Sequence, residues 1–263
     1  MELIRKVFHE RKAVIWALIN KEMVVKFGAS YLSYAWLLLE PLIYISLFCF
    51  VFLYVGKDTA LGLGMITFIT TGVLPFLFFR RTVQGASTVI DANRQLLNYS
   101  KVNIYDGILA RFLLEVIITV CVTIILLFFI VINDTTVVYS PERILIASFL
   151  LIIFTLGISF TMAIICYYLP DFAKINAIVF RLLMFISGVF YSLSQIPSSA
   201  AYYLSFNPIF QVIETIRTSL TMSYPSSFLS LKYTAVVSLL TLFLGISVYF
   251  YARNDISMGS KSR

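Results

Sequence analysis

The sequence predicts an all-α membrane protein with six transmembrane helices, on three observations. First, 60% of its 263 residues are apolar. Second, only 13% are charged, whereas a soluble domain carries about 25%. Third, the apolar residues gather into runs of about 20 residues, the length that a helix needs to cross a membrane. This composition excludes a disordered chain, a disulfide-stapled secreted domain and an ordinary cytosolic enzyme. Residues 1–263 are expected to form a single membrane domain.

An amphipathic helix is expected over residues 11–28, ahead of the first span. Ile15, Leu18 and Val25 lie toward one side of this helix, and the basic Lys12 lies elsewhere. Basic residues with a nearby tryptophan are typical of a helix that lies in the membrane interface. A cytoplasmic helix packed against the bundle is the alternative that this pattern leaves open.

Six apolar segments follow, each long enough for a span. The second contains Gly72 and Pro75, the uncharged part of the third starts at Val116, and Arg181 interrupts the fifth. The expected spans are residues 36–55, 61–79, 108–132, 144–169, 175–193 and 234–251.

Loop charges predict the orientation of these spans. Sixteen Lys and Arg residues fall on the side of both termini, and four fall on the other side. Because cytoplasmic loops of membrane proteins are enriched in Lys and Arg, both termini are expected in the cytoplasm. An even number of spans requires the same arrangement. The net charge of +7 is therefore attributed to topology and not to nucleic-acid binding.

Residues 80–107 form the longest connection expected on the cytoplasmic side. The segment is too long for a simple turn and too polar to span the membrane. A short helix near residues 87–99 is expected within it, and the loop is a candidate contact for a soluble partner.

Residues 194–231 form the longest connection expected on the outer side. Asn207 before Pro208 predicts a helix start, with Asn as the cap and Pro in the first turn. Apolar residues then repeat at helical spacing. Glu214 and Arg217 are three apart and can pair on the other face. We expect a short re-entrant or interfacial helix here.

Four charged side chains fall inside the expected spans, where charge is costly and marks functional candidates. All four, Glu40, Arg111, Glu115 and Arg181, lie near the cytoplasmic end of their spans. Arg111 and Glu115 are four apart and can pair on one helix. Arg181 can pair with Glu40 or Glu115 across helices. Structural pairing and a role in substrate passage both stay open.

A substrate pathway is expected to combine cations with aromatic rings. Arg80 and Arg81 follow the second span, where they either reach lipid headgroups or form a cationic threshold for an acidic substrate. Aromatic residues make up 16% of the chain, and a ring offers sugars a flat apolar surface. The aromatic candidates for the pathway are Phe76, Phe79, Tyr31, Tyr34, Trp36, Phe190 and Tyr191.

Several enzyme motifs are absent from the sequence. It holds no GxxxxGK[ST] pattern, so the chain is not expected to bind ATP through a P-loop. It also lacks GxSxG and HExxH, its one histidine is His9, and its three cysteines lie in apolar runs without CxxC spacing. We therefore expect no catalytic residue, metal site or cofactor on this chain.

Short patterns stand in a specific order along nearly the whole chain. They are Phe27-Gly28, Trp36 to Glu40-Pro41, Gly72 to Pro75-Phe76, Ile186 to Tyr191, Ile196-Pro197, Phe206 to Pro208, Ile213 to Arg217, and Tyr224. This order resembles the permease subunits of capsular polysaccharide ABC exporters, which belong to the type-2 ABC permeases. Many related permeases have an Arg-Asp pair where this chain has Leu169-Pro170-Asp171, so no role is carried over from that arginine.

The resemblance implies a six-span permease that works as a homodimer in the bacterial inner membrane. It implies two copies of a separate ATP-binding cassette subunit, which holds ATP and Mg²⁺, and periplasmic and outer-membrane partners that carry the polymer onward. Residues 11–28 resemble the interface helix, and residues 87–105 resemble the segment that contacts the ATPase. The coupling residues expected in that segment are Asp91, Asn93, Arg94, Tyr99 and Lys101.

The expected function is therefore export of a lipid-linked, acidic capsular polysaccharide, driven by ATP hydrolysis on the partner chain. One alternative is a permease of the same family with another cargo, such as O-antigen, teichoic acid or a small molecule. A more distant alternative is a membrane channel or enzyme, which would act without an ATPase.

Overall fold

The computed structural model describes residues 2–28, 31–55, 63–96, 103–133, 138–221 and 228–259, and these residues form helices and connecting turns with no strand. The prediction of an all-α chain is confirmed. The elements are α1 (Glu2–Phe27), α2 (Tyr31–Val55), α3 (Met65–Ala86), α4 (Val89–Ala92), α5 (Ile104–Asn133), α6 (Pro141–Tyr168), α7 (Phe172–Ile186), the 3₁₀ turn η3 (Leu193–Gln195), α8 (Ser198–Leu204), α9 (Pro208–Thr218) and α10 (Leu231–Gly259).

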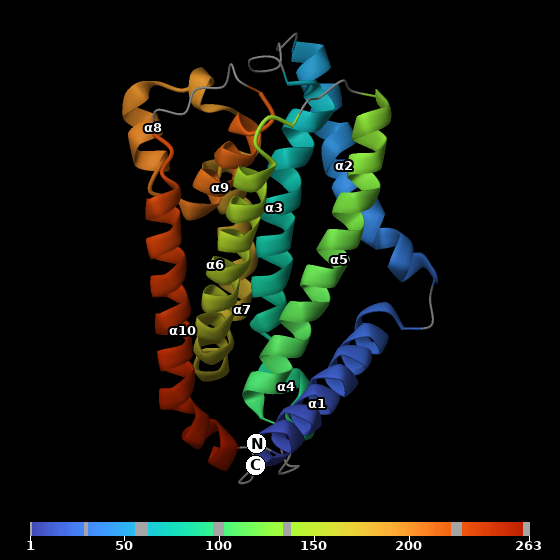
Figure 1. Ribbon diagram of the computed structural model, residues 1–263, viewed down its shortest axis with the longest axis vertical. Coiled ribbons are helices and arrows are strands. Elements are labelled where there is room, and N and C mark those ends of the chain that lie inside the picture. The colour runs from blue at the N-terminus through green and yellow to red at the C-terminus, as the bar shows by residue number, and fades with distance from the viewer. Residues whose placement is uncertain are drawn as a thin grey trace.

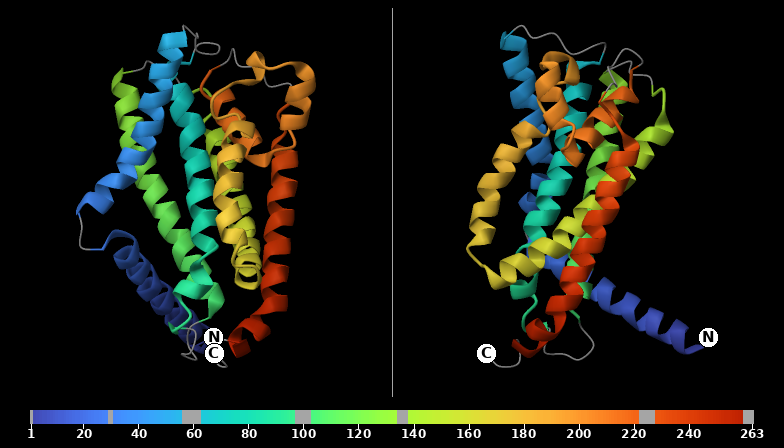
Figure 2. Two further views of the ribbon diagram at one scale, coloured as in Figure 1. Left: turned by 180° about the vertical axis from the view of Figure 1, so that it is seen from behind. Right: turned by 90° about the vertical axis from the view of Figure 1, so that its left-hand side faces the viewer.

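Helix α3 is the centre of the bundle. It contacts α2, α5, α6, α7 and α9, and the long helices stand side by side around it (Figure 1). Helix α1 lies at the end of the bundle that holds both termini, and it projects sideways from the long helices (Figure 2). It packs against α5. Residues 11–27 are helical as expected, but the helix begins earlier, at Glu2, and its place in a membrane interface stays a prediction.

Among the described residues, five helices are long and apolar enough to cross a membrane, namely α2, α3, α5, α6 and α10. The expected fifth span, residues 175–193, differs from the others because α7 ends at Ile186 after 15 residues. At about 1.5 Å per residue it is about 22 Å long, shorter than a hydrocarbon core of about 30 Å. Apolar residues continue in the sequence after Ile186, so hydropathy alone gives no sign of the turn that ends the helix.

That turn is built on Gly188. Its φ is +72°, a left-handed conformation that favours glycine. A Cβ at this position would overlap the ring of Phe210 on α9. Helices α8 and α9 then follow at the end of the bundle opposite the termini (Figure 1), and α9 packs against α3 and α6. The expected helix after Asn207 is confirmed, with its side chain accepting from the Ile209 amide at 3.0 Å.

The first residues of the loop expected over residues 80–107 are helical in the structure, contrary to expectation. Helix α3 runs on through Arg80 and Arg81 to Ala86, because both arginines have an acidic partner, Glu40, on α2. Of the short helix expected near residues 87–99, the described part up to residue 96 contains the single α-helical turn of α4, and the rest lies outside the described residues.

Helices α6 and α10 cross in close contact at two glycines. A Cβ on Gly157 would overlap the backbone of Thr241, and a Cβ on Gly245 would overlap the Gly157 carbonyl. Small residues at such a crossing let two backbones approach closely, which is a common way to pack helices in membranes.

Gly157→Ala is therefore expected to destabilise the protein by about 1–3 kcal/mol, since the added methyl group forces the two backbones apart. Thermal unfolding of the purified protein should show a melting temperature lower by about 2–10 °C. The matched control is Gly107→Ala on α5, where a Cβ would meet its neighbours at 3.4 Å or more. Equal melting temperatures for the two variants would contradict the close crossing.

Candidate functional site

Arg217 and Glu214 form an ion pair that is fully shielded from solvent. Nη1 of Arg217 donates to Oε1 of Glu214 at 2.8 Å, and both residues are 0% exposed. The pairing expected from their spacing on α9 is confirmed. The position differs from the amphipathic expectation, because the polar face of α9 points into protein and not into water.

Arg217 also joins three parts of the chain. Its guanidinium donates to the carbonyl oxygens of Gly188 at 2.7 Å and Val189 at 2.9 Å, just after α7, and to that of Phe68 on α3 at 3.1 Å. It lies 3.8 Å from the centroid of the Phe68 ring. Gly72 makes room for it, since a Cβ there would lie 2.7 Å from Nη2. The pair therefore fixes α9 against α3.

A second charge cluster lies where α2 meets α3. Glu40 binds both Arg80 and Arg81, and Arg81 donates from Nε to Oε2 of Glu40 at 3.0 Å. Arg80 also donates to the Tyr44 hydroxyl at 3.2 Å. The expected pairing of Glu40 with Arg181 is wrong. The two arginines of the predicted threshold are thus bound by a single glutamate of α2.

Ion pairs also join α1 to α5. Arg111 binds Glu22 through Nη2 at 2.6 Å, and Lys26 binds Glu115. Arg111 and Glu115 therefore do not pair with each other, contrary to expectation. Each pairs with an opposite charge on α1. Glu22 and Lys26 are four residues apart, as Arg111 and Glu115 are, and the two pairs carry their charges in opposite order along the chain.

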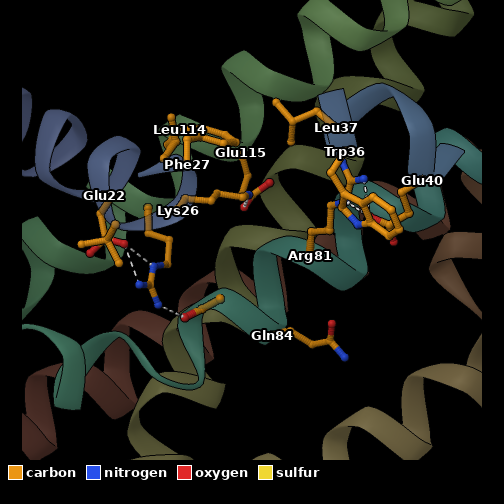
Figure 3. A pocket seen from close by; sticks show the side chains of 13 residues that line it. Glu22, Lys26, Phe27, Trp36, Leu37, Glu40, Arg81, Gln84, Leu114 and Glu115 are labelled. Carbon is orange, nitrogen blue, oxygen red and sulfur yellow. Dashed lines mark hydrogen bonds and ion pairs between the residues drawn. The ribbon is translucent and has the colours of Figure 1, made fainter. Parts of the chain in front are cut away.

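These charges line a pocket between α1, α2, α3 and α5 (Figure 3). Its volume is about 500 Å³, within the range typical of small-molecule sites. Acids and bases are balanced, with three of each, and the rim adds apolar side chains. We call it the charged pocket, and its lining residues are Glu22, Val25, Lys26, Phe27, Trp36, Leu37, Glu40, Arg81, Gln84, Gly85, Arg111, Leu114 and Glu115.

The predicted aromatic residues are not gathered into one path. Phe76 and Phe79 are buried in the core, where the Phe79 ring packs on Phe154 and Phe180. Phe190 is buried and stacks on Phe48 with ring centroids 3.7 Å apart.

Three more aromatic candidates lie elsewhere. Tyr34 stacks on Phe27, Trp36 is exposed at the rim of the charged pocket, and the Tyr191 carbonyl accepts from Arg217. Tyr31 begins α2, and its side chain lies outside the described part of the chain. A pathway role for the aromatic residues stays a prediction.

Arg181 stands apart from the other three charges that were predicted to lie inside spans. It is exposed on α7, and it forms no ion pair within the described ranges. Around it lie the exposed apolar side chains of Ile178 and Leu182, each 61% exposed. A charge on an apolar surface is costly in lipid, so this face is a candidate for contact with protein or water.

The predicted coupling residues are divided between surface and core. Asp91 on α4 and Arg94 just after it are exposed. Asn93 is buried, where its side-chain oxygen accepts from Lys21 at 2.7 Å and its amide donates to Glu22.

Tyr99 and Lys101, the other two coupling residues, lie outside the described residues. Among the residues that are described, no group of three or more His, Cys, Asp or Glu could hold a metal ion.

Sequence reasoning missed the role of α1 in this site. The amphipathic helix expected over residues 11–28 gave Lys21, Glu22 and Lys26 no role beyond lying away from its apolar side. The complementary charge order on residues 111–115 was the signal that could have assigned Glu22 and Lys26 to α5.

Comparison with known proteins places these features in a family. Residues 13–221 match the family described as ABC-2 type transporter. The polysialic acid transport protein KpsM of Escherichia coli is 31% identical over 94% of this chain and 96% of its own. The capsule polysaccharide export inner-membrane protein BexB of Haemophilus influenzae is 27% identical over 89% and 88%. The O-antigen export system permease protein RfbA of Klebsiella pneumoniae is 20% identical over 74% of each.

Arg217→Met is expected to destabilise the protein by about 3–5 kcal/mol, because it leaves the Glu214 carboxylate buried without its counter-charge. The double variant Glu214→Leu, Arg217→Met removes both charges and should lose less. Thermal unfolding of the purified variants measures both effects. Arg143→Met, at an exposed arginine of α6, serves as the control. The assigned role fails if Arg217→Met melts within 1 °C of the control, which is about the noise expected for a surface change.

Proposed function

The chain belongs to the ABC-2 type transporter family, and from this membership we propose that it is the permease subunit of an ATP-driven exporter of lipid-linked capsular polysaccharide. The observation that carries the proposal is the match over nearly the full length to relatives named for polysialic acid transport and capsule polysaccharide export. The relative named for O-antigen export matches less of the chain at lower identity, so capsular polysaccharide is the favoured cargo.

The proposed topology has six crossings with both termini in the cytoplasm of a bacterial inner membrane. Five of them are the long apolar helices. The other is α7 together with the turn at Gly188 and helices α8 and α9. The excess of Lys and Arg on the side of the termini supports this orientation. Non-helical backbone is tolerated in a membrane where it is buried against protein, and Arg217 satisfies the carbonyls of this turn.

ATP hydrolysis is assigned to a separate subunit, present in two copies, because this sequence has no P-loop motif. The proposed contact for that subunit is α4, with the exposed side chains of Asp91 and Arg94. Asn93 at the end of α4 binds Lys21 and Glu22 of α1. A movement of α4 would therefore be transmitted to α1 and, through Arg111, to α5.

The proposed dimer brings two copies together along α7 and the half of α2 that ends at Val55, while the half of α2 next to α1 borders the lipid. Both helices present exposed apolar side chains, among them Phe185 at 59% and Phe50 at 69%. Arg181 would then face a second copy or a water-filled path and not lipid, which resolves the cost of its charge. An acidic polymer would pass along this seam toward the periplasmic and outer-membrane partners.

The first test is purification of the tagged chain in mild detergent, with mass spectrometry of the proteins that co-purify. The expected result is a soluble ATP-binding cassette protein in a one-to-one ratio, because the permease has no ATPase of its own. A stable oligomer of this chain without any ATPase would contradict the exporter and favour a channel or membrane enzyme.

The second test concerns Arg80 and Arg81 as a cationic threshold for the polymer. Replacing both with Ala should lower surface polysaccharide about tenfold, the effect of losing about 1.4 kcal/mol of contact energy, with normal amounts of protein in the membrane. Because both arginines bind Glu40, the matched control adds Glu40→Gln to the double variant. Surface polymer should stay low in this triple variant. Its recovery would mean that the arginines only neutralise Glu40.

A further inference from the structure

We propose that the charged pocket binds the headgroup of a phospholipid that carries both a phosphate and a primary ammonium group, of the phosphatidylethanolamine type. The proposal needs only that α1 and α2 border the lipid, so it holds whatever the exported cargo is.

The pocket has the two-part surface that a phospholipid requires. At its rim, Val25 of α1 and Trp36 of α2 are 64% and 56% exposed, and both are apolar or aromatic. The apolar surface continues along α2 through exposed side chains such as Leu39 and Ile43. Acyl chains can lie on this surface, and a tryptophan at such a boundary is typical of the membrane interface. The interior of the pocket is lined by charges.

Glu115 supplies the acceptor for the ammonium group. Its side chain is only 6% exposed, and Lys26 occupies Oε1. The other oxygen, Oε2, is buried and has no hydrogen-bond partner among the described residues. A carboxylate has room for about four hydrogen bonds, and a buried one that is left unsatisfied is costly. In Figure 3 the Glu115 carboxylate projects into the pocket between the Lys26 and Arg81 side chains.

Arg81 supplies a donor for the phosphate. It binds Glu40 through Nε and Nη2, and Nη1 makes no hydrogen bond to the described part of the chain. The Lys26 side chain is 31% exposed and adds a second cation at the same pocket. Arg111 is less available, since Glu22, the Gly85 carbonyl and Thr88 already hold it.

The balance of charge selects a zwitterion. Three acids and three bases line the pocket, so a ligand with one negative and one positive group leaves the balance unchanged. An anionic headgroup without an ammonium adds a negative charge that nothing balances, and the hydroxyls of phosphatidylglycerol offer Oε2 of Glu115 only a neutral donor. A choline headgroup would leave Oε2 unsatisfied, because a quaternary ammonium has no N–H to donate.

The test uses the full chain, purified in detergent and analysed by native mass spectrometry with added phospholipids. Phosphatidylethanolamine, phosphatidylcholine and phosphatidylglycerol with identical acyl chains are compared. Phosphatidylethanolamine should be retained about tenfold more strongly than phosphatidylcholine, since it alone of the two donates a charge-assisted hydrogen bond. Equal retention of these two lipids, or preference for phosphatidylglycerol, overturns the proposal.

A pair of variants locates the effect in the pocket. Glu115→Gln should bring the retention of the two zwitterionic lipids to near equality, whereas Glu142→Gln, at an exposed glutamate of α6, should leave the preference intact. A preference that survives Glu115→Gln overturns the assignment. If Glu115→Gln does not fold, the lipid series on the unmodified chain still decides the question. Surface polysaccharide is measured separately, so failure here leaves the proposed export function untouched.

Discussion

The buried pair of Arg217 and Glu214 is the interaction on which the outline of the molecule depends. A single guanidinium binds a carboxylate, stacks on Phe68 and satisfies carbonyls that no helix satisfies. Without it, the backbone after α7 would carry unpaired polar groups into an apolar environment, at a cost of several kcal/mol each. The helix can therefore stop at Ile186 and the chain can turn back, because one side chain replaces the missing helical hydrogen bonds.

Charges are also paired at the opposite end of the bundle, where the partners lie on different helices. Glu40 holds two arginines of α3, and Arg111 and Glu115 of α5 are each matched on α1. Partnerships between helices specify how α1 and α2 sit on the core. Because an unpaired charge inside a membrane is costly, helix positions that allow these pairs to form are strongly favoured. Arg181 is the exception among the four predicted charges, and its position on an apolar surface marks the face that still needs a neighbour.

How far the sequence could predict this structure depended on the distance between interacting residues. The long apolar runs located five helices, and Asn207 with Pro208 located the start of α9, because these signals are local. The length of the fifth helix was missed, since hydropathy continues through Gly188 while the backbone turns there. The partners of Arg111 and Glu115 were also missed. Spacing along one helix suggested an internal pair, but the true partners are 89 residues away.

That separation of 89 residues imposes an order on how the chain assembles. Helix α1 leaves the ribosome first, yet Glu22 and Lys26 have no partner on α5 until residues 111 and 115 have been synthesised. The bond between Glu40 and α3 can close earlier, because its partners are separated by only about half that length. The N-terminal helix is therefore made first and docked late.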